Sequence, residues 1–249
     1  SLGSTTTGAN NTAVGKSALA ANTTGASNVA VGHLALDANT TASNNTAVGK
    51  GALSANTTGN FNVAVGTSAG IAVTTGTFNA LTGGQAGAAL TVGGENAAFG
   101  YNALVTDTKG SHSVAVGPYA LQTQNFTSAT DTFNTAVGYN AGGQITTGIK
   151  NTFIGGLAGD ATTTGRFNTA LGFQALTSNT TADGNTAIGN DALPANTTGA
   201  GNVAVGSGSL FANTTASNNT AVGLNSLVAN TTGTQNTAMG AFALDANTT

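Results

Sequence analysis

One glycine recurs along the whole chain at a spacing of 17 residues. It ends a short block, Asn-Thr/Val-Ala-Val-Gly, whose first copy covers residues 11–15. The recurring glycines are Gly15, Gly32, Gly49, Gly66, Gly83, Gly100, Gly117, Gly138, Gly155, Gly172, Gly189, Gly206, Gly223 and Gly240. Twelve of the thirteen intervals are 17 residues long, and the interval from Gly117 to Gly138 is 21. Such regularity predicts a stack of identical structural units.

The length of the period restricts the kind of stack. Two helices need about 30 residues or more per unit, so 17 residues are too few for a helical repeat. The period suits an all-β fold, a parallel β-solenoid (β-roll) with two short strands and two turns per coil. We therefore predict a single solenoid domain over residues 1–249, with about 14 coils and a four-residue insertion between Gly117 and Gly138.

Within a unit numbered from its Asn, the first strand covers positions 2 to 4. Side chains alternate across a strand, so positions 2 and 4 share one face and position 3 lies on the other. Position 4 is apolar in every unit except that of Thr82, and we expect it to face the core. Position 3 is Ala except at Leu81 and Phe153. A column of small apolar side chains on the outer face predicts close packing against another surface.

The second predicted strand centres on Ala-Leu at positions 8 and 9. Position 9 is Leu in ten units and Gly in four, namely Gly70, Gly87, Gly142 and Gly159. Three of these four units carry Val73, Leu90 or Ile145 at position 12, where Asn is usual, and Phe61, Phe78 or Phe133 directly before their first Asn. The pattern indicates that apolar volume is redistributed within a thin core, with Leu pointing inward.

The remaining constant positions predict turns and ladders. Gly at position 5 (Gly15, Gly32, Gly49, Gly66 and onward) marks a corner that needs positive φ or close backbone approach. Asn at position 1 (Asn11, Asn28, Asn45, Asn62 and onward) can form a hydrogen-bonded amide ladder, and Thr at position 13, from Thr6 to Thr248, can add a hydroxyl ladder. Asn-Thr-Thr recurs at Asn22, Asn39, Asn56, Asn179, Asn196, Asn213, Asn230 and Asn247. It matches a glycosylation sequon, but repetition in register favours a structural turn.

Composition excludes several classes of function. Only 5% of residues are charged, and the five Lys and Arg residues are never clustered, so we expect no nucleic-acid binding. No apolar run approaches the ~18 residues of a membrane span, and there is no Cys. His33 and His112 are expected to be lone surface residues. We therefore predict no enzyme activity, no metal and no cofactor.

The repeated Asn-Thr/Val-Ala-Val-Gly-x-x-Ala, from residues 11–15 to residues 236–240, resembles the YadA-like head repeats of trimeric autotransporter adhesins and similar arrays in phage and bacterial tail fibres. The resemblance covers the whole chain. It implies a left-handed coil, three chains packed around an axis, and an exposed adhesive fibre. The 17-residue unit is longer than the usual unit of the adhesins, and these 249 residues include neither a heptad stalk nor a membrane anchor.

The leading expectation is thus a structural and adhesive fibre module, a stiff rod at the cell surface, outside the cell or on a virion, that self-associates as a homotrimer or higher fibre. The alternative is an ice-binding β-solenoid. Tyr101, Tyr119, Gln122, Gln124, Phe126, Tyr139 and Phe173 form a candidate patch for binding a host or surface glycan, but a structural role, covering the solenoid where the insertion bulges, is favoured over it. The chain starts at Ser1-Leu2 and stops at Thr249, both midway through a coil, so we expect it to be a segment of a longer fibre chain.

Overall fold

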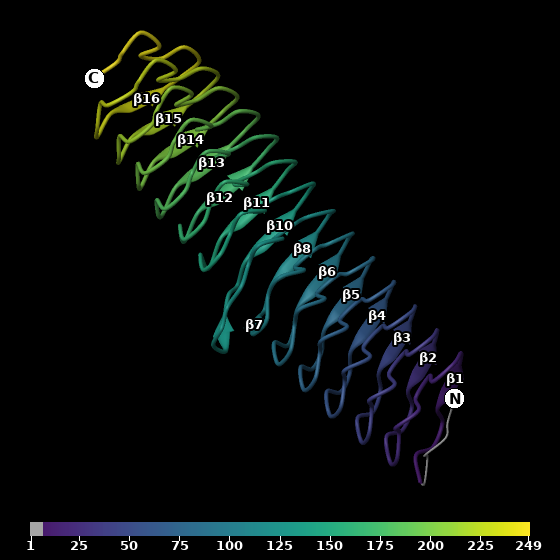
Figure 1. Ribbon diagram of the computed structural model, residues 1–249. Helices are drawn as coiled ribbons and strands as arrows, with labels where there is room; N and C mark the ends of the chain where they lie inside the picture. The colour runs from purple at the N-terminus through teal and green to yellow at the C-terminus, as the bar shows by residue number, and fades with distance from the viewer. Residues whose placement is uncertain (1–6) are drawn as a thin grey trace. The chain divides into compact units, whose positions relative to one another are not determined.

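The computed structural model describes residues 7–249 and divides into two compact units, residues 7–132 and residues 133–249 (Figure 1). The sheet of the first unit contains β1 (Thr12–Val14), β2 (Val29–Val31), β3 (Thr46–Val48), β4 (Val63–Val65), β5 (Ala80–Thr82), β6 (Ala97–Phe99) and β8 (Val114–Val116), and a second ladder pairs β7 (Gly110–Ser111) with β9 (Thr130–Asp131). The sheet of the second unit contains β10 (Thr135–Val137), β11 (Thr152–Ile154), β12 (Thr169–Leu171), β13 (Thr186–Ile188), β14 (Val203–Val205), β15 (Thr220–Val222) and β16 (Thr237–Met239). Residues 7–249 contain no helix.

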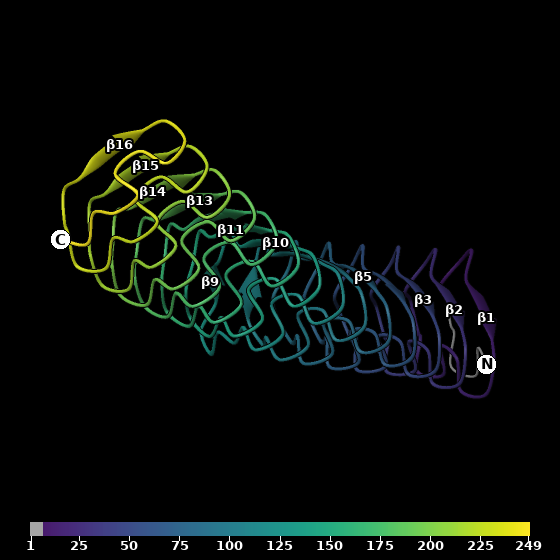
Figure 2. The same ribbon diagram turned by 90° about the horizontal axis from the view of Figure 1, so that it is seen from above.

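Each unit is a parallel β-solenoid. Neighbouring strands of its sheet pair in parallel, and each residue stands opposite the residue 17 positions later in the chain, as Thr12 stands opposite Val29. Figure 2 shows the coils of each unit lying one behind another. The prediction of an all-β solenoid with one 17-residue coil per repeat is therefore confirmed. The single domain over residues 1–249 and the left-handed coil stay predictions. The predicted start of the chain midway through a coil at Ser1-Leu2, and the predicted ladder position of Thr6, lie outside the described residues.

The prediction of two strands per coil is wrong, because the Ala-Leu segment forms a turn. Leu at position 9 adopts a left-handed backbone conformation, with φ of 51° at Leu19 and 50° at Leu53. This conformation cannot belong to a strand. The turn still bonds to the next coil, since Leu19 N donates to Ala35 O at 3.0 Å. Leu at position 9 is nevertheless fully buried in most coils, so its inward direction is confirmed.

The two faces of the strand are the reverse of those predicted. Position 3 lies inside, with Ala30 and Ala170 fully buried. Position 4 lies outside, where Ile154 is 38% and Leu171 is 44% exposed. The core is so thin that Leu at position 9 reaches the inner face of the strand and leaves room there only for Ala. The expectations of an inward position 4 and of an outward, interface-forming position 3 are both wrong.

The two large residues at position 3 show how the core is filled. A Cβ at Gly70 would lie 2.7 Å from Leu81 Cδ1, and a Cβ at Gly87 would lie 2.8 Å from Leu81 Cδ2. Gly159 makes room in the same way for Phe153, which is fully buried. Val73, Leu90 and Ile145 are also buried, so the predicted redistribution of volume is confirmed for them. Phe61, Phe78 and Phe133 are about half exposed and take no part in it.

The glycine at position 5 meets both demands expected of it. Gly32 has a φ of 136°, and a Cβ there would lie 2.5 Å from Gly49 O in the next coil. A side chain at this corner would therefore be strained and would also collide with the neighbouring backbone.

Two buried Asn ladders run along the inside of the coils. At position 1, Asn28 Oδ1 accepts a hydrogen bond from Asn45 N at 3.0 Å, and Asn28 Nδ2 donates to Ala42 O at 2.8 Å. At position 12, Asn39 Nδ2 donates to the same Ala42 O at 3.0 Å and to Asn22 Oδ1 at 2.9 Å. One carbonyl oxygen thus accepts two amides, which satisfies polar groups that would be costly to bury alone.

The threonine ladder is also present. Thr23 Oγ1 donates to Thr40 O in the next coil at 3.0 Å, and the same contact recurs at later coils. The sequon asparagines are ladder residues, as the structural interpretation predicted. Seven of them are fully buried, and their amide nitrogens are hydrogen bonded within the core: Asn22, Asn39, Asn56, Asn179, Asn196, Asn213 and Asn230.

Candidate functional site

The predicted glycan patch is only partly assembled. In the first unit, the rings of Tyr101 and Tyr119 meet edge to face, with centroids 5.6 Å apart. Tyr101 is 52% exposed, and Gln122 is half-buried in the same coil as Tyr119. In the second unit, Tyr139 and Phe173 are exposed at position 6 of coils that are not adjacent. Phe173 covers Gly156 of the coil between them, since a Cβ at Gly156 would touch its ring.

Two members of the predicted patch, Gln124 and Phe126, point inward and cannot bind a ligand at the surface. Gln124 is fully buried at position 12, the position of the ladder Asn, and Phe126 is 6% exposed. Gln124 Nε2 donates to Asp107 Oδ2 at 2.7 Å and to Ser113 Oγ at 2.8 Å. Counting positions from Ser113 would have placed Gln124 inside, so the sequence did contain this signal.

The buried Asp107 explains why this coil departs from the ladder pattern. Its Oδ1 accepts hydrogen bonds from Gly110 N at 3.1 Å and Phe126 N at 3.0 Å, while Oδ2 accepts from Gln124. A buried carboxylate requires such partners. The four extra residues follow, within residues 126–133, where β9 pairs with β7. Asp107, Gln124 and Ser113 are therefore structural.

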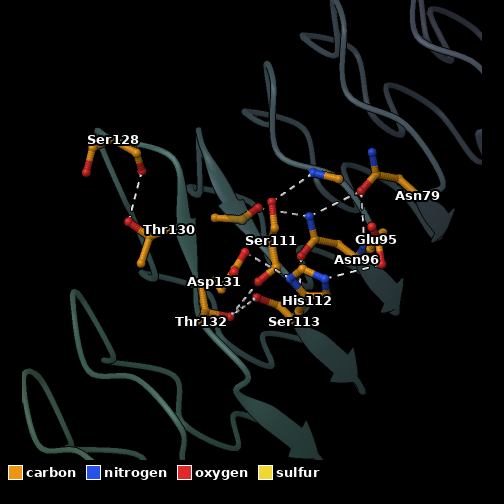
Figure 3. A network of polar contacts seen from close by, with 12 residues as sticks. Asn79, Glu95, Asn96, Ser111, His112, Ser113, Ser128, Thr130, Asp131 and Thr132 are labelled. Atoms are coloured by element: carbon orange, nitrogen blue, oxygen red, sulfur yellow. Dashed lines mark hydrogen bonds and ion pairs between the residues drawn. The ribbon is translucent and has the colours of Figure 1, made fainter.

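A charged cluster that the sequence analysis missed lies on the surface beside this insertion. Figure 3 shows His112 between two carboxylates: Nε2 lies 3.2 Å from Glu95 Oε2, and Nδ1 lies 3.1 Å from Asp131 Oδ1. The prediction that His112 is a lone surface residue is wrong. Glu95 and His112 both occupy position 17 of their units, so their spacing of 17 could have predicted the contact. Asp131 is brought to His112 by the insertion, which sequence periodicity could not place.

Glu95 also lines a hollow of about 570 Å³ on the outer sheet face, together with Phe78, Ala80, Asn96 and Ala97. Phe78 is one wall, and it stacks on Phe61 with ring centroids 5.1 Å apart and planes 2° apart. Ala80 and Ala97 stand at position 2, where the other coils have Thr or Val, so the smaller side chains of these two residues leave room for the hollow.

The cluster links neighbouring coils, because His112 contacts Glu95 of the preceding coil and Asp131 of the insertion. The two carboxylates contact opposite nitrogens of the His112 ring, so they do not converge on one point as metal ligands would. The described residues contain no group of three or more His, Asp or Glu side chains that could hold a metal ion. Ser113 Oγ lies 2.7 Å from Thr132 Oγ1 in the buried network beneath.

Within residues 7–249, no helix has the length and hydrophobicity needed to cross a membrane.

Comparison of the sequence with protein-family models, with curated proteins and with solved structures finds no match.

Proposed function

We propose that this chain is a non-enzymatic structural module of an extracellular or cell-surface fibre, serving display or attachment, and that it self-associates through the outer face of its sheet. The observation that carries the proposal is the apolar column at position 4. In the first unit Val65 and Phe99, and in the second unit Ile154 and Leu171, are between 37% and 44% exposed on the outer face of that unit's sheet. Contiguous exposed apolar patches typically mark interaction sites.

The type of sheet gives a second argument. Parallel sheets are normally covered on both faces. Here the inner face is covered by the Leu turn of the same coil, and the outer face has no cover within the described residues of either unit. Few charges oppose association, since the chain has 13 charged residues and a net charge of -3. A second copy presents the same apolar column and is therefore a suitable partner. The resemblance to trimeric adhesin heads implies three copies.

Native mass measurement of paired variants tests the proposal. Ile154→Lys with Leu171→Lys puts two charges on the exposed column, while Thr164→Lys with Thr181→Lys adds the same charges at exposed turn positions of the same coils. We expect the wild type and the turn variant to run as multiples of 23.8 kDa and the sheet variant as single chains. A monomeric wild type, or a sheet variant that keeps the wild-type mass, would overturn the proposal.

Ice binding is the second candidate, and the corrected strand faces favour it more than the sequence did. Position 2 shares the outer face with position 4, and it is Thr in six of the seven strands of the second unit. Thr152, Thr169 and Thr186 are paired in register and half-buried in successive coils. Such a regular row of hydroxyls beside an apolar row can order water. Thermal hysteresis that is lost in Thr169→Lys and kept in Thr181→Lys would support this function instead.

A further inference from the structure

A second hollow, of about 440 Å³, lies in the second unit on the turn side of the coils. Gln174 and Asp191 line it at position 7, Thr177, Pro194 and Phe211 at position 10, and Ser178 at position 11. Its volume is within the ~300–1,000 Å³ of small-molecule sites. The repeat is specialised here, because Phe211 is the only aromatic residue at position 10 in the sequence and Pro194 the only proline there.

The polar side chains of the hollow offer hydrogen bonds of both kinds. Asp191 Oδ2 accepts from Asn190 Nδ2 at 2.6 Å, which leaves Oδ1 with acceptor capacity. Gln174 supplies a donor and an acceptor on one amide. Thr177 Oγ1 donates to Asp160 in the preceding coil, so its oxygen can accept in turn. These groups suit a ligand that carries several adjacent hydroxyls.

The apolar part of the hollow is Phe211 with Pro194. Phe211 is 47% exposed, whereas Pro194 at the same position of the preceding coil is buried. A pyranose ring has one face made mainly of C–H groups, and an exposed aromatic ring provides a surface for it. An exposed aromatic ring that shares one hollow with a carboxylate and an amide therefore matches both the apolar face and the hydroxyl groups of a sugar ring.

The charges of the hollow determine which sugars fit. No Lys or Arg is among the residues that line it, and Asp191 lies within it. Asp160 lies beyond Thr177, and burial raises the pKa of its carboxyl group, whereas the hydrogen bond from Thr177 lowers it. The two carboxyl groups would repel an acidic sugar such as a sialic acid. The hollow therefore favours neutral sugars, whose hydroxyl groups can donate hydrogen bonds.

We propose that this hollow binds a neutral hexose unit of a glycan, with the sugar ring on Phe211 and its hydroxyls on Asp191 and Gln174. The inference rests on the proposed attachment function and gives it a ligand class. It assigns glycan binding to a surface other than the aromatic patch expected from the sequence.

Saturation-transfer NMR and calorimetry with the full chain test the site, with cellobiose, mannobiose and lactose as neutral probes and free N-acetylneuraminic acid as the acidic one. We expect at least one neutral disaccharide to bind with a Kd of about 1 mM and N-acetylneuraminic acid not to bind. Phe211→Ala and Asp191→Asn should each weaken binding about tenfold, or ~1.4 kcal/mol. Phe173→Ala, an exposed aromatic of the predicted patch, is the matched control and should change nothing.

Two outcomes would overturn the inference: no binding of any neutral probe at about 10 mM, ten times the expected Kd, or binding that is lost in Phe173→Ala and kept in Phe211→Ala. Circular dichroism of each variant separates a lost contact from a lost fold. None of these substitutions lies on the outer sheet face, so the native mass stays at the wild-type value whether or not sugar binds. Failure of the sugar site is thereby distinguishable from failure of self-association.

Discussion

Phe153 at position 3 and Gly159 at position 9 share one space in the core, because the Phe ring occupies the volume that a side chain at Gly159 would need. Most coils have Ala and Leu at these two positions. A Cβ at Gly159 would lie 2.6 Å from Phe153 Cε1 and Cζ and 2.7 Å from Cδ1. These atoms belong to one ring, which is fully buried and cannot move aside without displacing its neighbours. We therefore predict that Phe153→Ala and Gly159→Leu are each harmful alone and compensate each other when combined.

The magnitudes follow from the local geometry. Phe153→Ala leaves a cavity and should cost about 3–5 kcal/mol. Gly159→Leu overpacks the core, at about 1–3 kcal/mol, and places a side chain at a φ of 57°, at a further ~1–2 kcal/mol. Additive losses would reach about 5–10 kcal/mol, which is comparable to the whole stability of a domain. The double variant instead places Leu in the space left by the ring, so we expect a total loss of about 2–3 kcal/mol and a coupling of at least ~2 kcal/mol.

Urea unfolding followed by circular dichroism measures the cycle, and hydrogen exchange over residues 151–167 tests whether the damage is local. Phe167→Ala is the control, because Phe167 is an exposed aromatic of the same coil and should cost about 0.5 kcal/mol or less. Losses that add within about 0.5 kcal/mol would show that Phe153 and Gly159 do not share one volume.

Three further predictions concern the strand faces, the ladder and the pH dependence. Ala170→Asp should destabilise the coil by several kcal/mol because it buries an unpaired charge, whereas Leu171→Asp should leave urea unfolding of the single chain nearly unchanged; equal losses would contradict the assigned faces. Asn196→Ala removes three hydrogen bonds, since Asn196 Nδ2 donates to Gly199 O and Asn179 Oδ1 and its Oδ1 accepts from Asn213 Nδ2. It should cost about 1–3 kcal/mol; an unchanged melting temperature would refute the ladder's role. Burial raises the folded-state pKa of Asp160 above 3.8, so its unfavourable ionisation appears as pH rises through that folded value. Asp160→Asn should therefore raise the melting temperature at pH 7 and have little effect below about pH 3.8; the same increase at pH 3 would exclude this cause.

The repeat period was enough to predict the solenoid, its register and its ladders. Asn28 and Asn39 recur at fixed intervals, and a parallel stack brings recurring residues into contact. The faces of the strand could not be read in the same way. Val is more hydrophobic than Ala, so a pattern of Val and Ala assigns Val to the core, yet the space opposite the strand is already filled by Leu of position 9. That position 3 accepts only Ala in most coils follows from the packing of the whole coil and not from the strand alone.

The prediction of a second strand was wrong because of one dihedral angle, the φ of Leu at position 9. Leu rarely adopts a positive φ, so the residues Ala-Leu at positions 8 and 9 do not by themselves predict a left-handed turn. Gly at the same position, as in Gly70 and Gly87, was a signal of that conformation. The surface sites divide similarly. Glu95 and His112 share a unit position, so their contact was predictable, whereas the Phe211 hollow depends on how the turns of three coils lie together.

The corner at Gly32 has a consequence for how such a chain changes in length. The close contact at this corner is made by Gly49 O in the neighbouring coil, and the same contact recurs between other pairs of coils in each unit. A regular coil therefore presents the next one with the same backbone. Removal of one whole 17-residue coil would bring together two surfaces that already fit, except beside Leu81, which needs Gly70 of the coil before it, and beside the insertion. Loss or gain of a few residues would break both Asn ladders unless, as in the coil of Gln124, new polar partners replace them. Gene duplication and deletion in steps of one unit should thus be the tolerated route by which related chains differ in length.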